Sequence, residues 1–410
     1  MLPQEAAERE TLVSAVSSAM SSWGYGLVET PIAEEYATLE AGAGSSLEGT
    51  AFRLFDLDGS LLALRPEMTV PIARVAATRL AGEPGPLRLR YVSDVFREQA
   101  SLRGQARQFT QAGLELIGAS GPAADAEVIA IFVESLRATG LAQFSVGVGT
   151  VSVLRSIIDA AGMDEAWGEA VLGAAHERNL VGIDALASRA GVAPAAAAAL
   201  QSVPRIRGGR EAIGACRAAA AGCEVASTLD ELEATWDLLD AIGLTEWVSV
   251  DFGIMRSFDY YTGIVLEAYA PGLGLPVGGG GRYDGVMAEF GRPMPAAGFA
   301  IGVERLHIAL AEQGVRIDAP RLDAVLGGAP GDAFAAAARL RAAGWVVRLS
   351  ARAGLELVRE AEAAGAPEAL LAHGERIVRL DRAGEAATPL ADPLPGPPTR
   401  TWVREAGGRS

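Results

Sequence analysis

The residues best suited to chemistry lie between Asp251 and Leu310. An acid, an arginine and two tyrosines fall close together there, at Arg256, Asp259, Tyr260 and Tyr261. A strand-like run over 263–269 follows, and four glycines at 278–281 then precede Arg282, Tyr283 and Asp284. Glycine permits positive φ and lets the backbone approach a ligand closely. A polar cluster, a strand and a glycine turn are together typical of the lining of a small-molecule pocket.

Two earlier stretches offer acids that such a pocket needs. Glu67 and Thr69 stand at the start of a predicted helix, where acids and hydroxyls also serve as simple helix caps, and both interpretations stay open. Gln111, Gly113 and Glu115 share one face of a predicted strand by its period of two. Because Glu115 sits between two leucines, we expect it to be buried and to need a partner, either Arg256 or a cationic ligand.

Composition restricts the class of protein. The chain has 410 residues, half of them hydrophobic, and a formal net charge of −16. This length predicts two or three domains, and the acidic balance argues against non-specific nucleic-acid binding, although a local basic groove stays open. No apolar run suits a bilayer and the N-terminus lacks signal-peptide order, so we expect a cytoplasmic protein without membrane contact.

Several cofactor chemistries are excluded by residue types. The chain has no lysine, which removes a P-loop lysine, a Schiff-base lysine and a pyridoxal-phosphate lysine. Cys216 and Cys223 are too few for a zinc site or a disulfide framework, and the three histidines are scattered. We therefore expect no metal and no cofactor.

The pattern of elements predicts an α+β fold. Leu12, Val16 and Met20 keep helical spacing, and 27–30 reads as a strand. Asp58-Gly59 predicts a type I′ hairpin between strands 52–57 and 61–64. Strand 87–96, a polar loop around Gly104 and a return strand predict a long antiparallel hairpin. The alanine-rich stretch from about 151 to 241 predicts a helical insert, whose last helix begins with a capping box at Thr228–Glu231. Residues 324–380 alternate strand and helix.

Five motifs, in order, resemble those of class II aminoacyl-tRNA synthetases of the histidyl type. GYGLVETPI is similar to motif 1, FREQ…RQFTQAGLELIG to motif 2 and AAGFAIGVERL to motif 3. MRSFDYY and GGGRYDG resemble the two histidine-specific motifs. The resemblance implies an antiparallel sheet flanked by helices over 1–318, with the insert at about 151–241. It also implies that 322–410 is a C-terminal α/β domain resembling a degenerate anticodon-binding domain, and that motif 1 builds a homodimer.

The resemblance also implies a histidine site. Glu67 and Thr69 match residues that hold the α-amino group, and Glu115 matches one that holds the imidazole. Arg256 matches an arginine near the carboxylate. The remaining matches lie beside the amino acid or in the same wall: Gln111, Tyr260, Tyr261 and Tyr283. The chemistry is consistent, because carboxylates suit an ammonium and an imidazole N–H, and an arginine suits a carboxylate.

The nucleotide half departs from the family pattern. The motif 2 acid has become Gln99 here, or has moved to Glu98, and Gln105 and Ala106 stand where an arginine and a tyrosine are usual. Arg97, Arg107 and Arg305 remain as a residual phosphate-binding set. The helix ELVREAEAAGAPEAL of the C-terminal domain carries few cations for RNA phosphates, so tRNA is not an expected partner.

A chain that keeps the amino-acid pocket but has an altered ATP loop resembles the regulatory subunits of short-form ATP phosphoribosyltransferase. That resemblance implies a chain with no catalytic residues. Its partner is the catalytic subunit of the first step of histidine biosynthesis, and histidine is its allosteric ligand. Two alternatives stay open: a divergent histidyl-tRNA synthetase, and an RNA-binding or scaffolding module that uses the fold without a ligand.

Overall fold

The chain forms two compact units in a computed structural model. One unit comprises Leu12–Val315, and the other comprises Met1–Thr11 with Arg316–Ser410. The structure describes residues 2–43, 47, 49–99, 106–254, 261–317, 322–391, 394–395, 397 and 403–404. No helix among these residues is long and apolar enough to cross a membrane.

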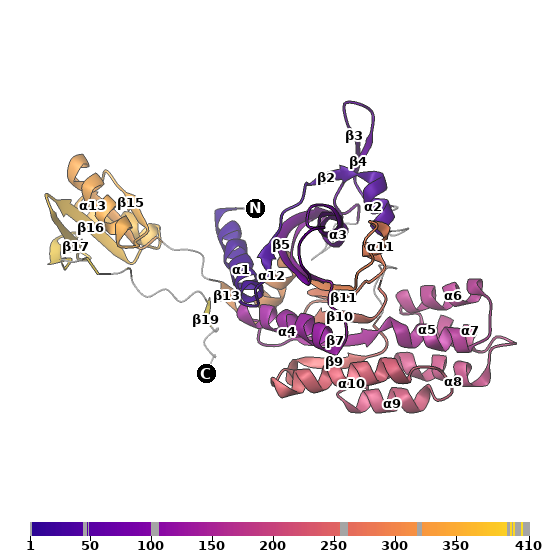
Figure 1. Cartoon of the computed structure of the whole chain (residues 1–410). Coiled ribbons are helices and arrows are strands. Elements are labelled where there is room, and N and C mark those ends of the chain that lie inside the picture. The colour runs from indigo at the N-terminus through magenta and orange to yellow at the C-terminus, as the bar shows by residue number, and fades with distance from the viewer. Residues whose placement is uncertain are drawn as a thin grey trace. The chain divides into compact units, whose positions relative to one another are not determined.

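The larger unit is built on a mixed sheet of nine described strands in the order β1-β5-β6-β12-β11-β10-β7-β9-β8 (Figure 1). Only β1 with β5 and β7 with β9 run parallel, so the sheet is mainly antiparallel, as the sequence predicts. The strands are β1 Gly26–Leu27, β5 Leu87–Phe96, β6 Gln108–Ile117, β7 Ser145–Thr150, β8 Arg207–Gly208, β9 Val248–Asp251, β10 Ile264–Tyr269, β11 Gly278–Arg282 and β12 Ala296–Gly302.

Helices cover this sheet and form the predicted insert. Phe132 of α4 stacks on Phe299 of β12, with ring centroids 4.6 Å apart, which places α4 against one sheet face. Figure 1 shows the insert helices gathered together beside the sheet. The helices are α1 Pro3–Ser22, α2 Tyr36–Ala43, α3 Thr69–Thr78, α4 Pro122–Ala138, α5 Val151–Ala160, α6 Glu165–His176, α7 Leu180–Ala187, α8 Pro194–Ser202, α9 Glu211–Ala219, α10 Ala226–Ala241, α11 Val286–Glu289 and α12 Val303–Glu312, with short 3-10 turns η2 Val203–Arg205 and η3 Thr245–Trp247.

The long hairpin β5–β6 is confirmed, and its register pairs Leu89 with Glu115. The polar loop around Gly104 lies outside the described residues. The glycine turn predicted at 278–281 is wrong, because these residues form β11, a central strand between β10 and β12. A Cβ on Gly280 would lie 2.0 Å from the carbonyl oxygen of Gly298. Glycine is therefore required here by close strand packing rather than by a turn.

Three local predictions differ from the structure. The hairpin β3 Arg53–Phe55 and β4 Leu61–Leu64 pairs Phe55 with Leu61, so its loop is longer than a type I′ turn. Within that loop Gly59 donates to the carbonyl of Asp56 at 3.0 Å, and the Asp58 side chain accepts from the backbone of Ser60. The capping box at Thr228 is wrong because α10 begins earlier, at Ala226. The strand predicted at 27–30 is shorter and ends at Leu27.

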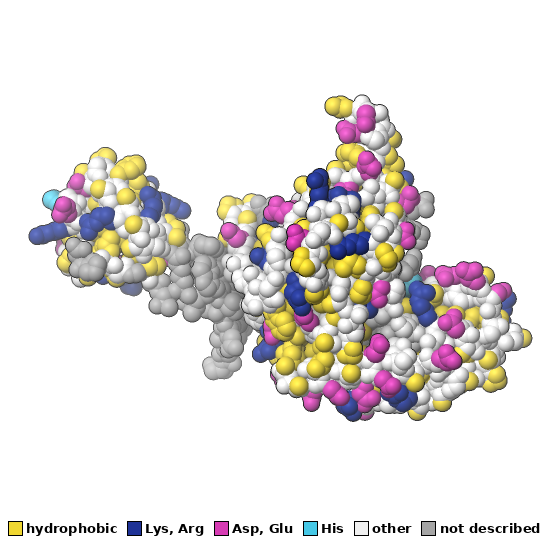
Figure 2. All heavy atoms as spheres, viewed as in Figure 1, with side chains coloured by type: hydrophobic (Ala, Val, Ile, Leu, Met, Phe, Trp, Pro, Cys, Tyr) yellow, Lys and Arg dark blue, Asp and Glu magenta, His cyan; other side chains and the backbone are white. Residues whose placement is uncertain are grey.

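The hairpin β3–β4 projects from the larger unit, with acidic and apolar side chains near its tip (Figure 2). Phe55 and Leu57 at this tip are strongly exposed. The hairpin belongs to a separate three-stranded sheet with β2 Ala33–Glu35, in the order β2-β4-β3.

The smaller unit contains the predicted alternation of strand and helix over 324–380. Its described sheet has the order β15-β14-β16-β17-β18, with β14 parallel to both β15 and β16. Its elements are β13 Arg316–Ile317, β14 Ala324–Gly328, α13 Pro330–Ala342, β15 Val347–Leu349, α14 Gly354–Ala363, β16 Glu368–His373, β17 Arg376–Leu380, β18 Ala386–Pro389 and β19 Val403–Arg404.

A buried ion pair ties α4 to the end of β11. The Arg282 guanidinium donates through Nε to Asp125 at 3.0 Å, and both side chains are about nine-tenths buried. Burial raises the pKa of Asp125, and Arg282 opposes that rise. Arg282 also contacts Asp284 at 3.2 Å. This pair fixes the chain just before Tyr283.

Replacing Asp125 by alanine tests the importance of the pair. We expect Asp125→Ala to lower the free energy of unfolding by about 3 kcal/mol, because a buried arginine loses its main partner. Urea unfolding of the full chain measures the change. Asp230→Ala is the control, since Asp230 pairs with Arg217 on the surface, and it should cost less than about 1 kcal/mol. Equal losses in the two variants would contradict a special contribution of the buried pair.

Candidate functional site

Six of the residues predicted for the histidine site meet at one place in the larger unit. Glu67, Thr69, Gln111, Tyr261 and Tyr283 line a common pocket, and Glu115 is hydrogen-bonded to two of them. The other lining residues are Tyr91, Arg97, Gly279, Gly280, Gly298, Phe299 and Ala300. Arg256 and Tyr260 lie outside the described residues. The pocket therefore joins the start of α3, the strand β6 and the segment after β11.

Glu67 lies just before α3, with both carboxylate oxygens held by the backbone of the first turn. It accepts from the N–H of Thr69 at 2.5 Å and from the N–H of Val70 at 2.9 Å. Glu67 therefore caps the helix, as the simpler interpretation had it, and also faces the pocket. Its burial raises its pKa, while these backbone donors and the positive charge of Arg97 oppose the rise. The capping interpretation of Glu67 is confirmed, and its contact with a ligand stays a prediction.

Glu115 is buried in β6, as predicted, with 1% of its surface exposed. The Thr69 hydroxyl donates to its Oε1 at 2.9 Å, and the Tyr283 hydroxyl donates to its Oε2. Burial raises the pKa of Glu115 to about 8, and the nearby Glu67 adds to the rise, while the two hydroxyl donors oppose it. Its described partners are therefore neutral hydroxyls, and the Tyr283 hydroxyl orients the carboxylate.

Gln111 presents an unsatisfied acceptor to the same pocket. Its side chain is about nine-tenths buried, and its Oε1 has no hydrogen-bond partner among the described residues. A buried acceptor without a donor costs about 1–3 kcal/mol, so such atoms in folded proteins call for an explanation. With two carboxylates nearby, the pocket offers acceptors for a ligand that carries several N–H donors.

The pocket is narrow in this structure. The space between its described lining residues is about 30 Å³, well below the roughly 300–1,000 Å³ of typical ligand pockets.

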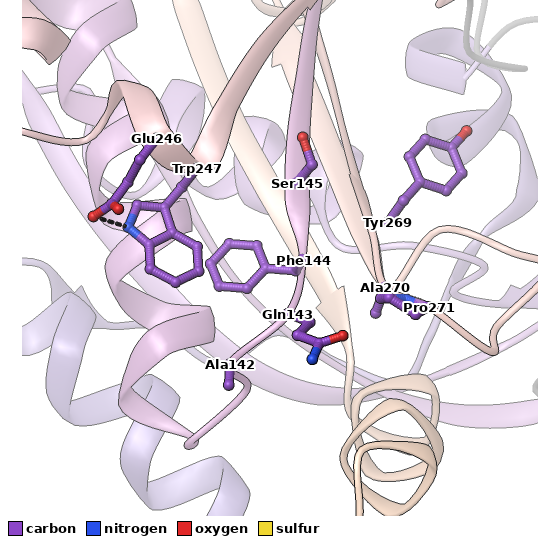
Figure 3. Close-up of a pocket in the computed structure, with 9 residues that line it drawn as sticks. All are labelled: Ala142, Gln143, Phe144, Ser145, Glu246, Trp247, Tyr269, Ala270 and Pro271. Atoms are coloured by element: carbon purple, nitrogen blue, oxygen red, sulfur yellow. Dashed lines mark hydrogen bonds between the residues drawn. The ribbon is translucent and has the colours of Figure 1, made fainter.

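A larger open hollow of about 520 Å³ lies elsewhere on the unit, and none of the predicted site residues lines it (Figure 3). Stacked rings of Phe144 and Trp247 dominate it, and its carboxylate, Glu246, accepts from the Trp247 indole N–H.

The three arginines proposed for phosphates have separate surroundings. Arg97 lines the pocket, and its Nε donates to the carbonyl of Pro66 at 2.8 Å. Arg107 pairs with Glu98 at 2.5 Å and lies over the ring of Phe52. Arg305 donates to the carbonyl of Pro276 at 3.0 Å. Among these three, only Arg97 lies in the wall of the carboxylate pocket.

Gln99 provides a local reason for the altered motif 2. Its side-chain nitrogen donates to the carbonyl of Ala106 at 2.8 Å, across the base of the hairpin loop. A glutamate at this position could not donate and would face a carbonyl oxygen. The amide therefore links the two described ends of the hairpin, Gln99 and Ala106.

Among the described residues, no group of three or more His, Cys, Asp or Glu side chains could hold a metal ion.

Sequence reasoning missed two features of the pocket wall. Tyr91 lines it from β5, and its hydroxyl donates to the carbonyl of Phe299 at 3.4 Å. Gly298 of β12 pairs directly with Glu115, and a Cβ there would lie 1.9 Å from Glu115 Oε2. Because Gly298 has no side chain, the Glu115 carboxylate can occupy the space beside it. No pattern in a single sequence links these positions, because the link is the register of two distant strands.

Replacing Gly298 by alanine tests this close approach. We expect Gly298→Ala to destabilise the larger unit by about 1–3 kcal/mol, because the new methyl group overlaps Glu115 and the Leu114 carbonyl. Chemical denaturation measures the loss. Gly274→Ala is the matched control, since a Cβ there meets nothing within 4 Å, and it should be nearly neutral. An unchanged stability of Gly298→Ala would show that the wall adjusts freely.

Comparisons with known proteins agree with these motifs. A family model described as histidyl-tRNA synthetase matches residues 1–306. The chain is 44% identical over 312 residues to an ATP phosphoribosyltransferase regulatory subunit from Moorella thermoacetica, covering 76% of this chain and 80% of the relative. It is 42% identical over 376 residues to one from Symbiobacterium thermophilum, covering 90% and 94%.

Comparison with solved structures agrees with the comparison of sequences. A Bacillus halodurans protein titled ATP phosphoribosyltransferase regulatory subunit/histidyl-tRNA synthetase superposes with a TM-score of 0.77 at 31% identity, over 85% of this chain and 90% of that one. A histidyl-tRNA synthetase from Nostoc shares the fold, with a TM-score of 0.78 at 21% identity and 95% coverage of both chains. The chain therefore belongs to the ATP phosphoribosyltransferase regulatory subunit family, whose members carry a histidyl-tRNA synthetase-like domain.

Proposed function

We propose that this chain is the non-catalytic regulatory subunit of a short-form ATP phosphoribosyltransferase in the cytoplasm. It activates the catalytic subunit, which carries out the first step of histidine biosynthesis, and it binds histidine in the Glu67–Glu115 pocket to inhibit the complex. The relatives named above support the first part. The observation that carries the second is the set of buried acceptors formed by Glu67, Glu115 and Gln111.

Histidine fits these acceptors by its chemistry. Its α-ammonium group supplies three N–H donors, which suit Glu67 and the unpaired oxygen of Gln111. Its imidazole ring supplies an N–H donor for Glu115, whose orientation Thr69 and Tyr283 set. Arg97 lines the pocket and suits the carboxylate of the ligand, a role that the family motifs give to Arg256. The histidine complex thus uses residues from α3, β6 and the motif after β11.

The nucleotide side supports a non-catalytic role. Activation of an amino acid by ATP needs fixed positive charges that stabilise the negative charge developing on the phosphate oxygens in the transition state. Arg107 is paired with Glu98, and Arg305 donates to a backbone carbonyl. Gln99 stands where the motif has an acid and closes the loop through Ala106. In the C-terminal unit, Arg352 and Arg379 pair with Glu360 and Glu368, which leaves less charge for RNA phosphates. We therefore expect no aminoacylation and no tRNA partner.

Reconstitution with the catalytic subunit tests the function. We expect the full chain to co-purify with a short-form catalytic subunit, to raise its rate of ATP condensation with phosphoribosyl pyrophosphate, and to make that rate sensitive to histidine. Inhibition requires that histidine binds two states of the complex with different affinities. Histidine-dependent pyrophosphate exchange with ATP, or formation of histidyl-tRNA, by the isolated chain would instead establish the divergent synthetase.

Thr69 gives a sharp test of the histidine site. Thr69→Val removes the hydroxyl donor to Glu115 and keeps the backbone donor to Glu67. We expect histidine affinity, measured by calorimetry, to fall about tenfold to a hundredfold, since a hydrogen bond to a charged group contributes about 1.5–3 kcal/mol. Thr78→Val is the control on the same helix, because its exposed hydroxyl only bonds to the Arg74 carbonyl. Equal affinities in the two variants would place histidine elsewhere.

We also propose a homodimer through motif 1. Trp23, Leu27 and Ile32 are exposed along this stretch, which includes the edge strand β1, and exposed apolar clusters favour association.

Introducing a charge on this apolar surface tests the dimer. We expect Leu27→Arg to shift the chain to a monomer in sedimentation velocity, because it places a charge in the apolar interface. Val181→Arg is the control, as Val181 is more exposed and lies on the helical insert. A dimer that survives Leu27→Arg would require a different interface.

A further inference from the structure

Two buried carboxylates meet at this pocket. Glu67 lines it and is 4% exposed, whereas Glu115 is 1% exposed and is held by two lining residues, Thr69 and Tyr283. Thr69 contacts both carboxylates, because its N–H donates to Glu67 Oε2 and its hydroxyl donates to Glu115 Oε1. The charge of Glu67 raises the pKa of Glu115, and two like charges in a poorly solvated site disfavour each other unless a cation compensates them.

The described groups around Glu115 supply no such cation in direct contact. Its hydrogen-bond donors are the hydroxyls of Thr69, from α3, and Tyr283, after β11. The adjoining strand β12 presents Gly298, and β5 presents Tyr91, whose hydroxyl is bonded to a carbonyl. Tyr25, Glu67 and Arg97 are the other titratable groups nearby: Glu115 contributes to the raised pKa of Tyr25, and the charge of Arg97 acts on Glu67. Arg256, Asp259 and Tyr260 lie outside the described residues.

The protonation of Glu115 follows from this arrangement. Burial, reinforced by Glu67, raises the pKa of Glu115 to about 8. At pH 7 the empty pocket therefore holds this carboxyl mainly in its neutral form. An incoming ligand with an ammonium group brings a positive charge, and a ring N–H brings a donor for the carboxylate. Both changes favour the ionised form of Glu115 in the complex.

We propose that histidine binding displaces one proton from the Glu115 carboxyl to solvent. The O–H bond of the carboxyl breaks, a buffer base takes up the proton, and the resulting carboxylate accepts the ligand N–H while no other covalent bond changes. This inference rests on the proposed function, because it takes histidine as the ligand. It makes the pocket a sensor whose response depends on pH as well as on the amino acid.

The sign of the pH dependence is fixed by this exchange. Glu115 is charged in the complex and mainly neutral in the empty pocket, so affinity rises as pH rises toward the pKa of the empty pocket and levels off above it. Between pH 7 and 8 the ionised fraction of a group with a pKa of about 8 grows about fivefold. Histidine affinity should therefore improve about fivefold over this interval, in which the ring of free histidine is mainly neutral.

Calorimetry in two buffers tests the proton release. Histidine is titrated into the full-length chain at pH 7.0 in phosphate and in Tris, whose ionisation enthalpies differ strongly. We expect release of about 0.9 protons per histidine bound. The apparent binding enthalpies in the two buffers should therefore differ by about 0.9 times the difference between the ionisation enthalpies of the buffers. Glu115→Gln should bind more weakly, with the same enthalpy in both buffers. Tyr283→Phe removes one hydroxyl that stabilises the carboxylate, so its pH–affinity curve should move to higher pH.

The outcomes separate the two proposals. Failure of histidine to bind in either buffer, by calorimetry and by thermal shift, would overturn the proposed histidine site itself. Binding with equal enthalpies in both buffers would overturn proton displacement and leave the histidine site standing. If proton release persists in Glu115→Gln, the proton comes from another group, and the proposed role of Glu115 is overturned. If Glu115→Gln binds too weakly to measure, an unchanged pH–affinity curve of Tyr283→Phe overturns the role of Glu115.

Discussion

The structure of the pocket depends on the burial of two carboxylates around one threonine. A buried carboxylate is stable only when donors or cations satisfy it. The first turn of α3 satisfies Glu67 through its backbone, and two hydroxyls satisfy Glu115. Space for these groups comes from the facing strands, where Gly298 lies against Glu115 and Gly280 lies against the β12 backbone. The glycine-rich strands and the acid-bearing strand are therefore parts of one arrangement.

The same principle separates the pocket from the motif 2 hairpin. In the pocket, the Gln111 oxygen has no hydrogen-bond partner among the described residues. In the motif 2 loop, polar groups satisfy one another, since Arg107 pairs with Glu98 and Gln99 bonds to Ala106. Under the proposed function, this difference explains how a synthetase fold keeps an amino-acid sensor without keeping activation.

Much of the site could be predicted from sequence because its residues lie on strongly patterned elements. The two flanking leucines predicted the burial of Glu115, and the helix start predicted the position of Glu67 and Thr69. The gathering of residues from α3, β6 and the β11 segment came from motif resemblance rather than from pattern. The role of 278–281 was misjudged, since four glycines signal a turn locally and a strand only when the neighbouring strands are known. The hydrogen bond from Tyr283 to Glu115 could not be predicted either, because only tertiary packing brings these two residues together.

Thr69 also couples two separate elements. Its backbone N–H at the start of α3 donates to Glu67, and its hydroxyl donates to Glu115 of β6. Any shift of this helix start therefore disturbs the contacts of both buried carboxylates at once.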